Sequence, residues 1–151
     1  MAGAHHEFSF FAVCESVSRD EGAVSLHGIF TTLTVPKGEL PGDLDCVIAV
    51  SGIILPPKWG KRLDLMAFRL APGGKRETLA GYRGTPLILP EVTGAQVCTW
   101  PIALPLWNAG FYGLDLWDRD GAFGPPHDPE GDDSQPAFLA STLFAVTEEG
   151  E

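Results

Sequence analysis

Apolar and polar residues alternate along most of this chain with a period of two. Such alternation is typical of a β-strand that buries one face and leaves the other in water. It is clearest late in the chain, where Tyr112, Leu114 and Leu116 occupy every second position. No window shows the 3.6-residue apolar spacing of a helix over three turns. The pattern therefore predicts an all-β protein with little helix.

Glycine, proline and aspartate separate the alternating stretches. Proline removes a backbone donor from a sheet, so the 13 prolines, which lie almost wholly between the stretches, mark loops. We expect seven or eight strands. The expected strands are 7–16, 23–35, 44–55, 62–70, 85–92, 95–106, 110–118 and 137–146.

The period-two positions also predict a core. We expect one face of each of four strands to be buried, while Pro101 and Pro105, on the opposite face of their strand, predict an edge or bulged strand. Residues 10–13 and 47–50 are apolar on both faces, which indicates a second covering layer or a protein interface. The expected core positions are Phe8, Phe10, Ala12 and Cys14; Val24, Leu26, Gly28 and Phe30; Leu44, Cys46, Ile48 and Val50; and Cys98, Trp100, Ile102, Leu104 and Leu106.

The length of 151 residues suits one domain, and no linker divides the chain. We therefore expect a single domain over residues 1–151. Within it, residues 122–136 form a long acidic loop rich in proline and glycine, long enough for a function of its own. Residues 147–151 are expected to be a frayed tail.

Negative charge is concentrated at the end of the chain. The net charge is −10, and the residues from Asp118 onward carry nine acids against Arg119 alone, which gives −8 for that part. A chain of this charge is repelled by phosphate, so nucleic acid and anionic membrane surfaces are poor partners.

The compartment follows from the cysteines and the N-terminus. The three cysteines are an odd number at wide spacing within apolar runs, which indicates buried thiols rather than a disulfide framework. The first residues do not have the pattern of a signal peptide, and no apolar run is long enough to cross a membrane. We expect a cytoplasmic protein.

Residues 106–121, LWNAGFYGLDLWDRDG, resemble the late strands of immunoglobulin-like β-sandwiches. In that fold a tyrosine near the start of a strand hydrogen-bonds to backbone upstream, and the resemblance assigns this role to Tyr112. No cysteine pair flanks a buried tryptophan as in antibody domains. The N-terminal half, from Phe8 through the turn at 19–22 to Phe30, resembles an uncharacterised family of small bacterial proteins. Both resemblances imply a single antiparallel β-sandwich, immunoglobulin-like or jelly-roll, and neither implies an activity.

Aspartates gather after the strand at 110–118 and could supply the oxygen ligands of a Ca²⁺ site at one end of the sandwich. Their spacing is not that of an EF-hand. The simpler interpretation, which we favour, is a solvated turn in which Asp120 and Gly121 supply the geometry of a hairpin. The candidate ligands are Asp118, Asp120, Asp128, Asp132 and Asp133.

Nucleophilic chemistry has one candidate pair, Cys14 and His27, in what reads as the first hairpin. Pairing positions whose numbers sum to 40 keeps apolar faces together and places Val13, not Cys14, opposite His27. A buried structural cysteine is therefore the favoured interpretation. Residues 5–7, His-His-Glu, could bind a transition metal but have no third histidine nearby. No catalytic or phosphate-binding motif is present.

Aromatic residues supply the best candidates for a binding surface. Phe111, Asp115 and Trp117 point away from the expected core, and Trp59 lies in a loop where burial is hard to arrange. Exposed aromatic side chains suit protein or carbohydrate contact, although they could equally seal loops against the sandwich.

These observations predict a non-enzymatic interaction or structural module without a cofactor. It would bind another protein or itself through a sheet face and its aromatic and acidic loops. The alternatives are a loop-end module that binds Ca²⁺ or carbohydrate, and a small hydrolase with a convergent site.

Overall fold

The computed structural model describes residues 7–29, 31–123 and 137–150. This part of the chain contains ten strands and one short 3₁₀ helix, which confirms the expected all-β class. The elements are β1 (Phe8–Cys14), β2 (Ser16–Asp20), β3 (Ala23–His27), β4 (Thr32–Val35), β5 (Gly42–Ile54), η1 (Pro56–Lys58), β6 (Arg62–Leu70), β7 (Arg76–Ile88), β8 (Gly94–Leu106), β9 (Gly110–Asp118) and β10 (Ala137–Glu148).

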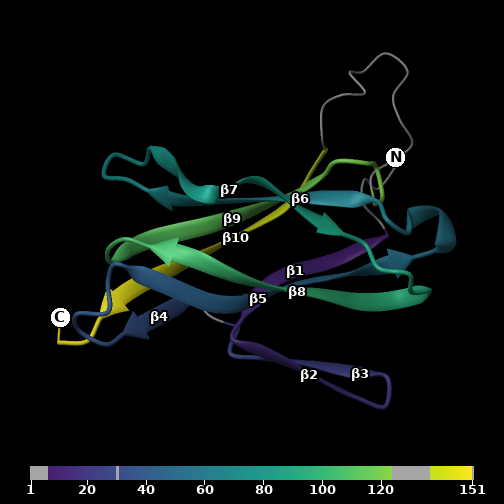
Figure 1. The fold of residues 1–151 in the computed structure, drawn as a ribbon, viewed down its shortest axis with the longest axis horizontal. Helices are drawn as coiled ribbons and strands as arrows, with labels where there is room; N and C mark the ends of the chain where they lie inside the picture. Colours follow the sequence, from purple (N-terminus) through teal and green to yellow (C-terminus); the bar gives the residue numbers. More distant parts are fainter. Residues whose placement is uncertain (1–6, 30, 124–136, 151) are drawn as a thin grey trace.

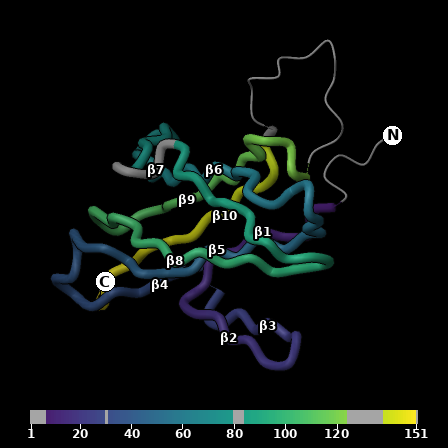
Figure 2. Tube along the Cα trace, turned by 45° about the vertical axis from the view of Figure 1, so that its right-hand side comes forward, coloured from purple at the N-terminus to yellow at the C-terminus, as the bar shows by residue number. Residues whose placement is uncertain are grey.

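The strands form three sheets. One has the order β1-β5-β8, the second has the order β4-β10-β9-β6-β7, and β2 and β3 form a separate hairpin. All neighbours are antiparallel except β4 and β10, which are parallel. Figure 1 shows β6, β7 and β9 above β5 and β8, with β4 lower at the left and the hairpin extending below β5 and β8. In the turned view of Figure 2 the hairpin still lies apart from both larger sheets.

The two larger sheets share one hydrophobic core. Its side chains come from both sheets, so the sheets face each other. The predicted core faces of residues 44–50 and 98–106 are confirmed, and β8 is an edge strand as its prolines predicted. Core side chains no more than 1% exposed include Val13, Ile48, Val50 and Leu104 on one side and Leu63, Leu65, Leu114 and Leu116 on the other.

The predicted core face of β1 is correct at its ends, where Phe8 packs against the core and Cys14 is buried, but wrong in the middle of the strand. Val13 lies in the core with Phe11 packed against it, whereas Phe10 is 38% exposed. β1 is apolar on both faces, so its alternation alone could not choose between them. Pairing with β5 makes the choice, because it sets Val13 opposite the core residue Ile48 and shifts register before Phe10.

The predicted first hairpin is also different. β1 pairs with β5, and the hairpin joins β2 to β3 with Asp20 opposite Ala23. The two turn residues between them, Glu21 and Gly22, have φ angles of 45° and 84°. A two-residue turn of this kind fixes the register of its hairpin, so it overrides the pairing inferred from apolar faces.

Three other boundaries differ from expectation. Residues 23–35 are two strands, because Gly28 turns the chain with a φ of 70° after β3. The strand expected at 85–92 begins already at Arg76 and ends at Ile88, in a long hairpin with β6. Residues 147 and 148, expected in a frayed tail, belong to β10, because they pair with β4.

The chain enters β9 through a corner built on Tyr112. Its hydroxyl donates to the carbonyl of Asn108 at 2.7 Å and accepts from the amides of Trp107 at 3.1 Å and Asn108 at 3.3 Å. The ring is 1% exposed and stacks on Phe144, with 5.9 Å between centroids. The tyrosine therefore bonds to upstream backbone as the resemblance implied.

Replacing Tyr112 with phenylalanine tests the energetic weight of this corner. We expect Tyr112→Phe to lower the free energy of unfolding by about 1–3 kcal/mol, because two backbone amides lose their acceptor while the ring packing is kept. Urea unfolding followed by tryptophan fluorescence measures the change. A loss below about 0.5 kcal/mol would show that water replaces the hydroxyl without penalty.

Candidate interaction surface

The side chains of the five-stranded sheet that point away from the core form a continuous surface, called here the outer face. Cross-strand register places these residues in four rows across β6, β9 and β10. The rows are Asp64, Trp117 and Phe138; Met66, Asp115 and Ser141; Phe68, Gly113 and Leu143; and Leu70, Phe111 and Ala145.

Three large apolar side chains of the outer face are open to solvent. Phe111 is 61% exposed, Leu143 is 54% exposed and Phe138 is 46% exposed. Single exposed apolar residues are ordinary on a protein surface, whereas several on one sheet face mark a contact site. The β9 and β10 half of the outer face is therefore the apolar half.

At the centre of the outer face, Gly113 leaves room for side chains of the two neighbouring strands. A Cβ at this glycine would lie 2.4 Å from Phe68 Cζ and 2.7 Å from Leu143 Cδ2, so both side chains occupy the space above the bare backbone. The Arg76 guanidinium lies over the Phe68 ring, 4.0 Å from its centroid. The same guanidinium donates from Nη1 to Asp115 Oδ2 at 2.7 Å. Phe68 is 4% exposed beneath this cover.

A second ion-pair group frames the other end of the outer face. The buried carboxylate of Asp64 accepts from Arg62 Nε at 2.5 Å and from Arg119 Nε at 2.8 Å. Arg62 also donates from Nη2 to the carbonyl of Gly84 at 3.1 Å. A buried carboxylate is costly unless its charge is paired, and here two guanidinium groups supply the pairing. Each acid on the outer face thus has an arginine partner.

Three of the four predicted binding residues lie together on this surface: Phe111, Asp115 and Trp117. Trp117 is half-buried and meets Phe138 edge to face, with ring centroids 5.2 Å apart. Trp59 lies elsewhere, in the loop after η1, where its indole donates to the carbonyl of Val92 at 2.7 Å. The indole therefore fastens one loop to another, although the ring remains 38% exposed.

Sequence reasoning missed Leu143, Phe138 and Phe68 as parts of the surface. β10 carries apolar residues on both faces, as Phe144 and Val146 are buried while Leu143 and Phe138 are exposed. Apolar residues on both faces of this strand were the sequence signal that could have indicated an exposed apolar surface. Assigning the faces required the register between β9 and β10.

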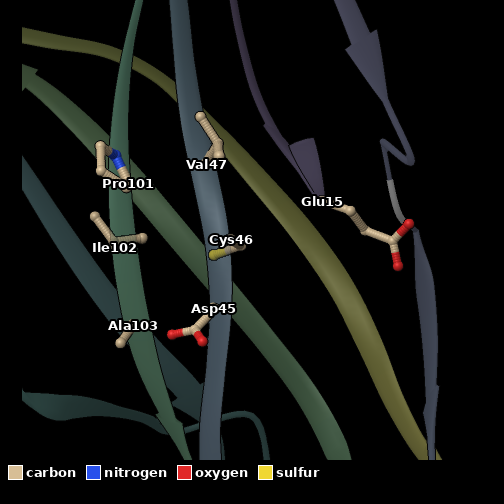
Figure 3. Close-up of a pocket in the computed structure, with 7 residues that line it drawn as sticks. All are labelled: Glu15, Asp45, Cys46, Val47, Pro101, Ile102 and Ala103. Atoms are coloured by element: carbon tan, nitrogen blue, oxygen red, sulfur yellow. The ribbon is translucent and has the colours of Figure 1, made fainter. Parts of the chain in front are cut away.

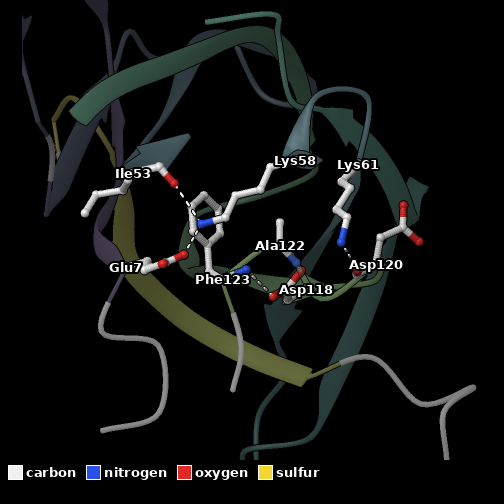
Figure 4. Close-up of polar contacts among 8 residues, drawn as sticks. All are labelled: Glu7, Ile53, Lys58, Lys61, Asp118, Asp120, Ala122 and Phe123. Carbon is white, nitrogen blue, oxygen red and sulfur yellow. Dashed lines mark hydrogen bonds and ion pairs between the residues drawn. The ribbon is translucent and has the colours of Figure 1, made fainter. Parts of the chain in front are cut away.

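Two of the aspartates considered as metal ligands, Asp118 and Asp120, accept hydrogen bonds from backbone amides at the end of β9; Figure 4 shows both residues. Asp118 is 2% exposed and accepts from the amides of Ala122 at 2.7 Å and Phe123 at 2.8 Å. Asp120 Oδ2 accepts from the amide of Arg62 at 2.8 Å. Within the described ranges no group of three or more His, Cys, Asp or Glu side chains is placed to hold a metal ion. Asp128, Asp132 and Asp133 lie outside the described residues.

The same end of the core is closed around Phe123. Lys58 forms an ion pair with Glu7, donates to the carbonyl of Ile53 at 2.9 Å, and lies 5.3 Å from the centroid of the Phe123 ring (Figure 4). Phe123 is 2% exposed and packs where Gly52 leaves room, since a Cβ on that glycine would lie 2.7 Å from the ring. The first two residues of the predicted loop 122–136 are therefore buried, and residues 124–136 lie outside the described part.

The candidate nucleophile and histidine do not meet. Cys14 Sγ donates to the carbonyl of Val47 at 3.7 Å, whereas His27 Nε2 is hydrogen-bonded to Ser18 Oγ at 2.7 Å. All three cysteines are free and buried, as predicted. Burial raises the pKa of the Cys14 and Cys98 thiols and raises that of Cys46 to about 12. His5 and His6 lie outside the described residues, and Glu7 is paired with Lys58.

A hollow of about 350 Å³ lies where β1 ends beside β5 and β8. In Figure 3 the Glu15 and Asp45 carboxylates extend from different elements, and Cys46 lies between Val47 and Asp45 on β5. The remaining lining is Pro101, Ile102 and Ala103. A thiol with a raised pKa is a poor nucleophile, so Cys46 is not an activated thiol.

No protein-family model matches the chain. A search of curated proteins likewise found no match. In the described part of the structure, no helix has the length and apolar character needed to span a membrane.

Removing the Asp118 carboxylate tests its role as a backbone acceptor. We expect Asp118→Ala to lower the free energy of unfolding by about 2 kcal/mol, because two buried amides lose their acceptor. The loss should be the same in calcium and in EDTA, measured by urea unfolding. A wild-type protein that calcium stabilises, with the gain lost in Asp118→Ala, would assign the carboxylate to a metal site instead.

Thiol reactivity tests the interpretation of the cysteines. With a pKa of about 12, only about one Cys46 thiol in ten thousand is ionised at pH 8. We expect all three thiols of the native protein to react at least about 100-fold more slowly with a disulfide reagent than those of the urea-unfolded chain. Since the thiolate is the reactive form, raising the pH from about 7 to 9 should accelerate the unfolded chain by less than about 100-fold, because its thiols become largely ionised over that range. The native Cys46 thiol stays far below its pKa, so its rate should rise by about 100-fold and still remain much the slower. A native thiol that reacts as fast as the unfolded chain would identify an accessible nucleophile.

Proposed function

We propose that this protein is a non-enzymatic interaction module that binds another protein, or a second copy of itself, through the outer face. The observation that carries this proposal is the group of three exposed apolar side chains on one sheet face: Phe111, Leu143 and Phe138. Aromatic and aliphatic anchors surrounded by polar groups are typical of the centre of a protein interface.

The packing around these anchors supports the proposal. Phe68 lies flat over Gly113 and is covered by Arg76, which is itself held by Asp115. Asp64 holds two arginines at the opposite end. Side chains already fixed in this way lose little conformational freedom on binding, so more of the contact energy is available for affinity.

The strand order supports an immunoglobulin-like form of β-sandwich as the scaffold. In that fold one sheet contains strands A, B and E, and the other contains strands G, F, C and, in variable-type domains, C′. β1, β5 and β8 correspond in order to A, B and E, and β10, β9, β6 and β7 to G, F, C and C′. Tyr112 stands at the start of the strand equivalent to F, where such domains carry their corner tyrosine. β4 is an extra edge strand beside β10.

Leu143→Arg tests the proposed function. We expect the wild-type protein to form an assembly larger than the 16.2 kDa monomer or to retain a protein partner on an affinity column. Leu143→Arg should abolish whichever assembly forms, because it places a charge at the centre of the apolar half. The measurement is size-exclusion chromatography with light scattering, together with the column.

Ile29→Arg is the matched control, since Ile29 is 57% exposed in the connection after β3, away from the outer face. It should leave the assembly intact. A wild-type protein that is monomeric and retains no partner contradicts the proposal. So does an assembly that survives Leu143→Arg.

A further inference from the structure

β8 forms an open edge of the three-stranded sheet. Among the strands that the structure describes, its partner in that sheet is β5 alone, with which it pairs in regular antiparallel register over its whole length. In such a ladder alternate residues direct both their N–H and C=O groups to the partner strand, and the residues between them direct both groups away. Pro101 and Pro105 have no N–H, so they fit only positions that point away from β5. Val97 lies four residues before Pro101, an even number, so its backbone N–H and C=O also point away from β5.

The two prolines protect only the second half of this edge. From Gly94 to Trp100 the outward-pointing residues are Ala95, Val97 and Thr99, each of which has a backbone N–H. Edge strands are usually protected by charged side chains, but β8 has no Lys, Arg, Asp or Glu in its thirteen residues. The first half of β8 therefore carries no protection of its own against pairing.

A residue of the β2–β3 hairpin supplies the missing protection. Arg19, on β2, donates from Nη2 to the carbonyl of Val97 at 2.9 Å. This carbonyl is at the centre of the unprotected half of the edge. The guanidinium thus occupies the acceptor that an added strand would use, and it places a charge beside an uncharged strand.

The hairpin that carries Arg19 is held to the rest of the molecule by few buried groups. Every residue of β2 and β3 is half-buried or exposed. At its base the amide of Glu15 donates to the carbonyl of His27 at 3.0 Å. Segments with little buried apolar surface open locally at low free-energy cost, so the Arg19 contact can break without unfolding the core.

We propose that residues Gly94–Trp100 of β8 are a pairing surface for a second copy of this chain, kept closed by Arg19. A two-fold axis at Val97 would set the two Val97 residues opposite each other and Ala95 opposite Thr99 of the second copy. The backbone N–H and C=O groups of all these residues point away from β5, so each pair would exchange two backbone hydrogen bonds. The pairing ends at Pro101, which has no donor.

A second copy can meet this edge because the edge is uncharged. Each copy carries a net charge of −10, which opposes contact through most of its surface. The uncharged β8 edge brings no acidic side chains together, and Val97 and Thr99 are β-branched residues that suit cross-strand pairs. Added salt would screen the remaining repulsion and strengthen the pairing.

Arg19→Ala tests the proposal by removing the protecting side chain. We expect its molar mass in light scattering to double relative to the wild-type protein at equal concentration, more completely at high salt. Hydrogen exchange at the amides of Ala95, Val97 and Thr99 should slow in the same samples. Lys37→Ala, which makes the same change of charge in a loop, should leave mass and exchange as in wild type.

Val97→Pro in the Arg19→Ala background identifies the surface, because proline at this outward position removes the central donor without disturbing the ladder to β5. The double variant should return to the wild-type mass, whereas Leu143→Arg in the same background should not prevent the β8 pairing. An Arg19→Ala protein of unchanged mass, or a doubling that persists with Val97→Pro, would overturn the proposal. Because Leu143→Arg affects the outer face alone, failure of this pairing is distinguishable from failure of the proposed function.

Discussion

The position of β9 in the middle of the five-stranded sheet is the constraint on which the rest of the structure depends. Its inward side chains, Tyr112, Leu114 and Leu116, are at most 1% exposed and fill the space between the two sheets. Its outward positions include Gly113, which has no side chain, and the side chains of Phe68 and Leu143 from the neighbouring strands occupy the space above it. One nine-residue strand thus organises both the core and the surface that we propose for binding.

The buried acidic side chains of this fold are each held by a charged or polar partner. The buried carboxylates of Asp64 and Asp115 lie under the outer face, and each is held by arginine. Asp118, also buried, is satisfied by backbone amides at the end of β9. The described acids that the sequence suggested for cation binding are therefore already used in holding strands and loops together, and the outer face is left apolar with its charges compensated.

Parts of the sequence prediction depended only on local chemistry, and these agree with the structure. The alternation in residues 44–50 and 98–106 identified their core faces, because a polar residue, Asp45 in one strand and Thr99 in the other, marks the opposite face. Pro101 and Pro105 identified an edge strand because neither can donate to a neighbour. The resemblance to immunoglobulin-like strands implied the bond of Tyr112 to upstream backbone, and the bonded groups lie within five residues of each other in the chain.

What the sequence determined by itself was the all-β class, the edge character of β8, the burial of the cysteines and the outward position of Phe111, Asp115 and Trp117. Only the tertiary structure decided which face of β1 is buried, since both faces are apolar and the pairing with β5 makes the choice. It also decided that Leu143 and Phe138 join the outer face, and that Arg19 reaches Val97 across 78 positions of sequence. These contacts join residues far apart in the chain, and a periodic pattern specifies which side a residue faces but not which strand lies beside it.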